Sequence, residues 1–190
     1  MIDLVLKKSK ERSLLRRHPW VYDTAVQKVV LDSKKTAPAS GETVRVVSFD
    51  GRFLAWAAYS PQSTIRARCW SFKEEEVIDA SWFERKLRHA VEARACLRDR
   101  TSAVRLVFGE ADGLPGLIVD QYADCLVTQF QSAGVEAHRE LIADLLMEIT
   151  GAKTIFDRSD AATRQREGLP IRSELLRGEE PPFHLGSSKK

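Results

Sequence analysis

The stretch Ser13-Leu-Leu-Arg-Arg-His-Pro-Trp-Val-Tyr22 lies in the most basic segment of this 190-residue chain. Six basic side chains occupy the eleven residues from position 7 to 17, and His18 and Trp20 follow directly. Guanidinium groups bind phosphate oxygens in pairs and stack on bases, and aromatic rings also stack on unpaired RNA bases. The stretch therefore predicts an RNA-binding surface. The alternative is that Trp20 belongs to a core and that the arginines form an ordinary solvated face.

The charge distribution divides the chain. Residues 1–73 contain 14 basic and 6 acidic side chains, a net charge of +8, whereas residues 74–190 contain 16 and 21, a net charge of −5. A basic block on an otherwise acidic chain is typical of a surface for a polyanion. The sign changes at Lys73-Glu-Glu-Glu76, which predicts a domain boundary there. We expect one domain over 1–73, a second over 74–178, and a linker or tail over 179–190.

The composition narrows the class of protein. Hydrophobic residues make up 43% of the chain and charged residues 30%, which suits folded domains with ordinary cores. No apolar run is long enough to cross a bilayer, and residues 1–8 lack the features of a signal peptide. We therefore expect no membrane partner and a cytoplasmic location. The three cysteines are widely spaced, and with the scattered histidines they predict neither disulfides nor a metal site.

The first 73 residues are typical of a small β-barrel or sandwich. Strands are predicted over 3–7, 43–49, 52–59 and 64–72, and Asp50-Gly51 is a strong hairpin signal between the second and third. Ser9 is expected to cap a short helix that ends before Pro19. In the last strand, Arg66, Arg68 and Trp70 share one face, and Trp70 fits either a core or an exposed surface equally well.

The second domain combines two helices with short strands. A helix is predicted over about 81–98, with Ser81 and Glu84 as a capping box, and another over 135–149, with Gly151 after its end. Strands are expected over 104–108, 117–120, 125–130 and 154–157, and residues 161–168 are helical or irregular. The predicted fold class is mixed α/β (α+β): a small β pseudobarrel followed by an α+β domain.

Familiar catalytic motifs are missing from the sequence. A methyltransferase or dehydrogenase of the doubly wound type needs a glycine-rich turn between a strand and a helix. The cluster Gly109-Glu-Ala-Asp-Gly-Leu-Pro-Gly116 precedes a strand instead, and Pro115 withholds an N–H group. Two helices and short strands cannot form the repeated βαβ units of such a fold. The pattern therefore predicts no catalytic residues and no cofactor-binding residues in this chain.

Two weaker signals leave alternatives open. Glu110, Asp112 and Asp120 suit either an acid–base pair or ordinary turn positions, and the latter reading is favoured. The run Asp157-Arg-Ser-Asp160 suits either a functional cluster or an ion-paired cap. Cysteines that fall inside predicted strands and a helix are typical of buried structural thiols rather than nucleophiles.

Several motifs in order resemble a known family. Leu14-Leu-Arg-Arg-His-Pro-Trp-Val-Tyr22, Gly41-Glu and Ala57-Ala-Tyr-Ser-Pro-Gln-Ser-Thr-Ile-Arg-Ala-Arg68 are similar to the N-terminal PUA domain of bacterial SAM-dependent 23S ribosomal RNA cytosine-C5 methyltransferases. Gly109–Asp120 and the segment that begins at Asp157 resemble the central domain of that family. The likeness extends over about residues 4–182. In the family, the catalytic domain, its cysteine and its S-adenosylmethionine site come after this point.

The resemblance implies a role in recognising ribosomal RNA, without catalysis by this chain alone. The candidate RNA-binding residues are Lys7, Lys8, Arg12, Arg16, Arg17 and His18, with Arg66 and Arg68 as a second set. Since the sequence stops soon after Pro182, we expect a truncated or split form of such an enzyme that has no cofactor of its own. The rivals are half of a methyltransferase completed by another chain, a module that docks a protein or forms a homodimer, and a non-functional remnant.

Overall fold

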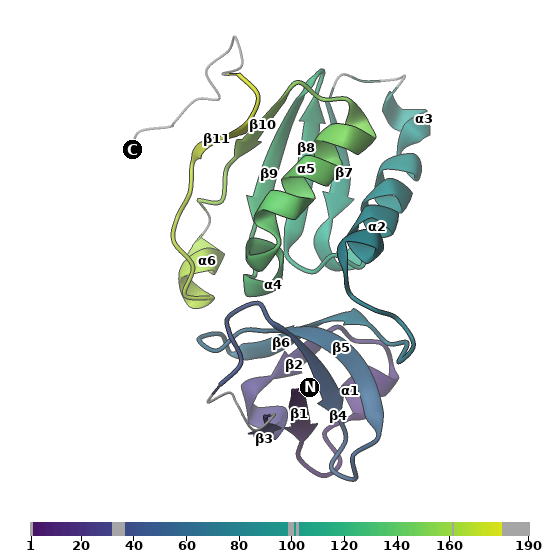
Figure 1. Ribbon diagram of the computed structural model, residues 1–190, viewed down its shortest axis with the longest axis vertical. Coiled ribbons are helices and arrows are strands. Elements are labelled where there is room, and N and C mark those ends of the chain that lie inside the picture. Colours follow the sequence, from purple (N-terminus) through teal and green to yellow (C-terminus); the bar gives the residue numbers. More distant parts are fainter. Residues whose placement is uncertain (1, 32–36, 99–100, 102, 161, 180–190) are drawn as a thin grey trace.

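The computed structural model describes residues 2–31, 37–98, 101, 103–160 and 162–179, which form two sheets stacked along the long axis of the molecule (Figure 1). The first sheet is curled and has the strand order β2-β6-β5-β4-β1-β3. All its neighbours are antiparallel except β1 and β4. Its strands are β1 (Asp3–Leu6), β2 (Trp20–Tyr22), β3 (Val26–Val30), β4 (Thr43–Val47), β5 (Phe53–Tyr59) and β6 (Ile65–Ser71).

Alternating apolar residues of these strands fill one core. Leu4 and Leu6 of β1 meet Val44 and Val46 of β4 there, and all four are buried. The predicted hairpin is confirmed, because β4 and β5 pair antiparallel around a turn in which Gly51 has φ +85°. A positive φ favours glycine, which has no Cβ to clash.

The short elements of this half are helix α1 (Arg12–Leu15) and the 3-10 turn η1 (Asp23–Ala25). The predicted cap at Ser9 is wrong. Glu11 occupies the N-cap position without a side-chain cap, and Ser9 lies in a turn with φ +66°. The turn is closed by the backbone N–H of Lys10, which donates to the carbonyl of Lys7, so Ser9 belongs to the turn and not to the helix.

The second sheet has the order β11-β10-β9-β8-β7, with helices on one face (Figure 1). Only β9 and β10 are parallel, and the helical segment between them makes a single βαβ crossover. The strands are β7 (Ala103–Phe108), β8 (Leu117–Tyr122), β9 (Cys125–Phe130), β10 (Thr154–Asp157) and β11 (Glu174–Arg177). The helical elements are α2 (Ala80–Glu92), α3 (Ala95–Arg98), η2 (Gly109–Asp112), α4 (Ala133–Ala137), α5 (Arg139–Thr150) and α6 (Ala162–Arg166).

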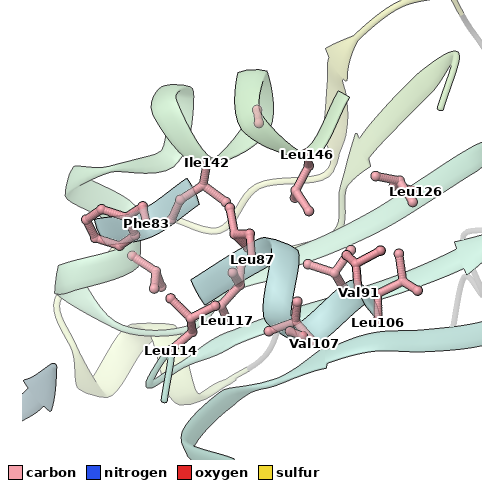
Figure 2. Close-up of a cluster of buried hydrophobic side chains, with 14 of the residues drawn as sticks. Phe83, Leu87, Val91, Leu106, Val107, Leu114, Leu117, Leu126, Ile142 and Leu146 are labelled. Atoms are coloured by element: carbon pink, nitrogen blue, oxygen red, sulfur yellow. The ribbon is translucent and has the colours of Figure 1, made fainter. Parts of the chain in front are cut away.

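A second core lies between these helices and the sheet. Figure 2 shows Leu87 and Val91 of α2 together with Ile142 and Leu146 of α5, close to Leu106 and other side chains of the strands. Full burial of a side chain of this size stabilises the fold by about 1.5–3 kcal/mol. This core is the larger of the two, and it fixes the helical layer on the sheet.

Several sequence predictions for this half need correction. Asp79, not Ser81, caps α2, since its carboxylate accepts the backbone N–H of Trp82 at 2.9 Å. The helix predicted over 81–98 is interrupted after Glu92, and the one predicted over 135–149 is two helices. Strand β11 was not predicted. The predicted helix end is confirmed, because Gly151 follows α5 with φ +67°.

The two halves touch closely. Trp70 is part of β6, but its side chain packs against Trp82 and Phe83 of α2 in the other half, at ring-centroid distances of 5.8 and 5.4 Å. A Cβ added to Gly134 of α4 would lie 2.5 Å from the Trp70 ring, so only glycine permits this approach. Trp70 is therefore a core residue, but of the second half. The mixed α/β fold class is confirmed, whereas the boundary drawn at residue 73 stays a prediction.

None of the described helices is long and apolar enough to span a membrane. Nearly all of the predicted linker or tail, from residue 180 onward, lies outside the described residues.

Candidate nucleic-acid interface

The basic side chains of residues 7–18 are exposed on the first half of the protein. Lys7, Lys8 and Lys10 lie in the turn after β1, and Arg12 and Arg16 lie on α1 or at its end. All of these side chains are exposed, as are those of Arg17 and His18. The fold therefore keeps together the whole first set of candidates, because a turn and a single helical turn connect them.

Most of these charges are not neutralised within the described part of the protein. Lys8, Lys10, Arg12 and Arg16 have no acidic side chain within salt-bridge distance among the described residues. Lys7 donates from Nζ to the carbonyl oxygen of Thr24 at 2.9 Å, which orders it without cancelling its charge. Unpaired cations on one face create a positive potential that attracts polyanions such as phosphate chains.

Arg17 is held differently from its neighbours. Its backbone has φ +62°, a left-handed conformation that is uncommon for residues other than glycine. Its guanidinium lies over the Phe72 ring at 5.1 Å and donates to the carbonyl oxygen of Phe72 at 3.3 Å. The side chain is thus fixed against the end of β6, with further N–H groups left over for a ligand.

A pocket of about 220 Å³ opens beside this arginine; we refer to it as the α1 pocket. Its buried part is apolar, and two exposed arginines border it. The residues that line it are Leu14, Leu15, Arg17, Arg52, Phe53, Leu54 and Phe72. Arg52, Phe53 and Phe72 were missed from sequence, because three separate segments of the chain must fold before these side chains meet.

Trp20 lies where the two halves meet and is half-buried. Its ring meets His18 edge-on at 5.5 Å, and its Nε1 donates to Glu110 of η2 at 2.8 Å. Neither of the two sequence alternatives describes it fully, since it is neither a barrel core residue nor a free ring. Its hydrogen bond to the second half makes it part of the contact between the halves.

The second set of candidates, Arg66 and Arg68, forms ion pairs with acids of the same chain. Arg66 donates to Asp23 at 2.7 and 3.0 Å. Arg68 donates to Glu167 at 2.8 Å, lies 3.7 Å from Glu110, and its side chain is only 12% exposed. These guanidinium groups are therefore matched by acids and are less available to a phosphate than the exposed set.

Glu167 connects the halves and was not singled out from sequence. Its buried carboxylate accepts hydrogen bonds from the hydroxyls of Ser60 and Ser63 at 2.9 and 2.6 Å, besides the one from Arg68. It also accepts the backbone N–H of Ala133 at 3.4 Å. The acid follows α6, whereas Arg68 lies on β6 and the two serines lie in the turn between β5 and β6, so this cluster joins the two halves.

The other acids considered from sequence have structural partners. Asp112 accepts two hydrogen bonds from Arg94, at 2.7 and 3.0 Å, and Asp120 accepts two from Arg105, at 2.8 and 2.9 Å. Asp157 is fully buried beside Arg139, at 2.7 Å. Carboxylates held by arginines in this way act as structural acids. Within the described ranges no group of acids, histidines and cysteines is arranged to hold a metal ion.

Two of the three cysteines lack the features of nucleophiles. Burial raises the pKa of the Cys69 thiol to about 12 and also raises the pKa of Cys125. A reactive cysteine needs a lowered pKa and access to solvent. The prediction of a buried thiol is wrong for Cys96, which is exposed on α3 because the short helix leaves this side chain outside the core.

Comparison with known proteins finds similarity over both halves of the chain. A family model for a PUA-like domain matches residues 4–72. The chain is 44% identical over 190 residues to the ribosomal RNA large subunit methyltransferase I of Yersinia pseudotuberculosis and to that of Yersinia pestis. Each match covers 99% of this chain and 47% of the relative, so the chain spans about half the length of these curated relatives.

Solved structures share the fold across both halves. A Streptococcus mutans protein named as a SAM-dependent methyltransferase matches with a TM-score of 0.74 at 19% identity. A methyltransferase structure solved as a complex with SAH gives a TM-score of 0.75 at 19% identity. Each covers 96% of this chain and 44% of the other. The first half thus matches the model of a PUA-like domain, and both halves together share the fold of part of these two solved structures.

Proposed function

We propose that this chain binds ribosomal RNA through the exposed basic segment Lys7–His18 and acts as the RNA-recognition part of a large-subunit rRNA methyltransferase. The observation that carries the proposal is the set of exposed, unneutralised cations on a PUA-like domain. Phosphate contacts from lysine and arginine supply much of the affinity for RNA and make it depend on salt. The similarity to ribosomal RNA large subunit methyltransferase I supports the choice of ribosomal RNA.

The exposure of each basic side chain suggests which part of the RNA it contacts. We assign phosphate contacts to Lys7, Lys8, Arg12 and Arg16, and we assign to Arg17 and His18 contacts nearer the bases. Arg66 and Arg68, given the same role by sequence, are in our proposal positioning residues, because their guanidinium groups already bind Asp23 and Glu167. The cytosine-C5 class of the parent enzyme is proposed from the sequence resemblance.

Catalysis is assigned to a part of the enzyme outside this chain. The glycine-rich strand-turn-helix motif that binds S-adenosylmethionine in doubly wound folds does not occur in the sequence. We therefore propose that this chain binds RNA without binding the cofactor, and that the parent enzyme uses it. From a ribosomal RNA ligand we also propose a cytoplasmic location.

The test is a titration of the purified chain with fragments of large-subunit ribosomal RNA at two salt concentrations, with S-adenosylmethionine binding measured by calorimetry in parallel. We expect RNA binding that weakens as salt increases, and no heat of cofactor binding. Absence of RNA binding at low salt would refute the proposal. Binding of the cofactor would refute the assignment of catalysis to another part.

A second candidate is that the chain is one half of an enzyme completed by further sequence, on the same or another polypeptide. The coverage of 47% of the curated relatives favours it. It goes beyond RNA binding by this chain alone, because it predicts methyl transfer when the missing half is supplied. Mixing the chain with a separately expressed catalytic half and measuring methylation of ribosomal RNA tests it. If this chain does not increase methylation by the catalytic half, the second candidate is wrong. Association without methylation would instead indicate a homodimer or a protein-docking role.

A further inference from the structure

The α1 pocket lies next to the basic segment and has the composition of a site for a flat ring. Leu14 and Leu54 are buried within it, and the half-buried rings of Phe53 and Phe72 also line it. Such a lining can make apolar contacts with an unpaired base and stack on it. A hydrated phosphate or a base-paired helix needs neither kind of contact. The exposed phenylalanine Phe49 of the neighbouring turn does not line the pocket.

Positive charge stands at the opening. Arg17 and Arg52 are both exposed and line the pocket, and neither forms a salt bridge with a described residue. The nearest acid in sequence to Arg52 is Asp50, whose pKa is lowered chiefly by its hydrogen bond to Ser48 and only weakly by the charge of Arg52. Two guanidinium groups beside an apolar pocket suit a ligand that is flat at one end and anionic at the other.

The size of the pocket limits the ligand. Sites that enclose a whole drug-sized molecule have volumes of about 300–1,000 Å³. The α1 pocket is smaller, at about 220 Å³, which leaves room for one ring system with its phosphate outside. A nucleotide has this shape and charge.

Arg17 adds a stacking surface. RNA bases that are splayed out of a helix stack on aromatic rings and on the planes of arginine guanidinium groups. The Arg17 guanidinium is held over Phe72 at 5.1 Å by a hydrogen bond to the carbonyl oxygen of that residue. The left-handed backbone at Arg17 directs the side chain there at some cost in strain, which is typical of functional positions.

We infer that the α1 pocket binds one unpaired nucleobase of the RNA, with Phe53 and the Arg17 guanidinium stacking on the base and Arg52 binding an adjoining phosphate. The inference rests on the proposed RNA-binding function and makes it more specific. It means that the PUA-like domain recognises RNA at a bulge, loop or end, and not along a continuous helix.

The test compares two RNA hairpins with the same stem, one fully paired and one with a single bulged 2-aminopurine. The full chain is expected to bind the bulged hairpin roughly five- to tenfold more tightly, which is within the range for stacking of one base. Fluorescence of the 2-aminopurine is expected to fall on binding as the base stacks. Equal affinity for both hairpins, or unchanged fluorescence, would overturn the inference.

Variants separate the pocket from the basic segment. Phe53→Leu keeps an apolar side chain but removes the flat ring, and it should abolish the preference for the bulge. Phe49→Leu is the matched control on the same hairpin turn, and the preference should survive it. Arg52→Ala should weaken binding of the bulged hairpin more than that of the paired one. If Phe53→Leu and Phe49→Leu give the same preference as the original chain, the pocket does not hold the base.

The outcomes also separate the two proposals. If both hairpins bind equally and with strong salt dependence, the basic segment binds RNA and the pocket assignment is wrong. If neither hairpin binds at low salt, both the pocket assignment and the proposed function are wrong. A circular dichroism spectrum and a melting curve for each variant confirm that any loss does not come from unfolding.

Discussion

At the scale of single residues, Glu167 is the most consequential side chain outside the basic segment. It is 3% exposed and binds Arg68, whose side chain is 12% exposed, together with two serine hydroxyls. Removing one partner of a buried ion pair leaves an uncompensated charge in a poorly hydrated place. This residue therefore determines the stability of the contact between the two halves.

We expect Glu167→Ala to lower the free energy of unfolding by about 3–5 kcal/mol, the usual cost of breaking a buried pair. Urea denaturation followed by tryptophan fluorescence measures it. Glu148→Ala is the control, because Glu148 forms an exposed pair with Arg88 and should change stability very little. Equal denaturation midpoints for the two variants would show that Glu167 does not hold the halves together.

The thiols provide a second test at the scale of residues. Burial raises the pKa of Cys69 to about 12, so its reactive thiolate is almost absent at about pH 8. Burial also raises the pKa of Cys125, whereas Cys96 is exposed. We expect a thiol reagent to label the native protein rapidly at one position, and Cys96→Ser to remove this fast phase. Fast labelling of two or three thiols in the native protein would contradict this assignment of burial.

At the scale of elements, local sequence signals predicted eight of the eleven strands in the described part of the chain, missed β2, β3 and β11, and placed the helix ends poorly. The β4–β5 hairpin was predictable because its turn requires a positive φ and the sequence supplies Gly51. The cap of α2 was misplaced, since Asp79 and Ser81 are both good capping residues and only the packing of Trp82 in the core selects one helix start. Strand β11 has no alternating pattern and forms because β10 offers it an edge.

The position of the α2 cap can be tested directly. Asp79→Ala should lower the free energy of unfolding by about 1 kcal/mol, because it removes the acceptor for the Trp82 N–H group. Ser81→Ala should have almost no effect, although the sequence pattern alone made Ser81 the cap. Thermal melting of both variants measures the difference. A larger loss of stability for Ser81→Ala than for Asp79→Ala would show that Ser81 is the capping residue, as the sequence pattern predicts.

At the scale of the whole molecule, the two halves are joined by groups that look ordinary in sequence. Trp70 packs beside Trp82, Trp20 binds Glu110, and Arg68 binds Glu167. The sequence placed Arg66, Arg68 and Trp70 on one face of a strand but could not reveal that Arg68 and Trp70 meet the second half, whereas Arg66 binds Asp23 of its own half. It grouped Arg66 and Arg68 with the exposed arginines because their partner acids, Asp23 and Glu167, lie far from them in sequence.

The candidate site was partly predictable. The cluster from Lys7 to His18 is contiguous in sequence and stays together in the fold, because one turn and one short helix contain it. The α1 pocket was not predictable, since Arg17, Phe53 and Phe72 are brought together only when β5, α1 and the end of β6 meet. Local charge is thus visible in a sequence, whereas a cavity built from distant segments is not.

The central claim is that the exposed cations of the basic segment bind RNA phosphates. It is tested most directly by the salt dependence of RNA binding for the original chain and for Arg12→Ala/Arg16→Ala, two exposed arginines with no acidic partner among the described residues. Arg85→Ala/Arg158→Ala removes the same charge from exposed arginines of the second half and is the control.

We predict that Arg12→Ala/Arg16→Ala weakens binding and lowers the slope of log affinity against log salt by about one to two, the loss of up to two phosphate contacts. The control should leave the slope unchanged. The same affinity and slope for all three proteins would contradict the account.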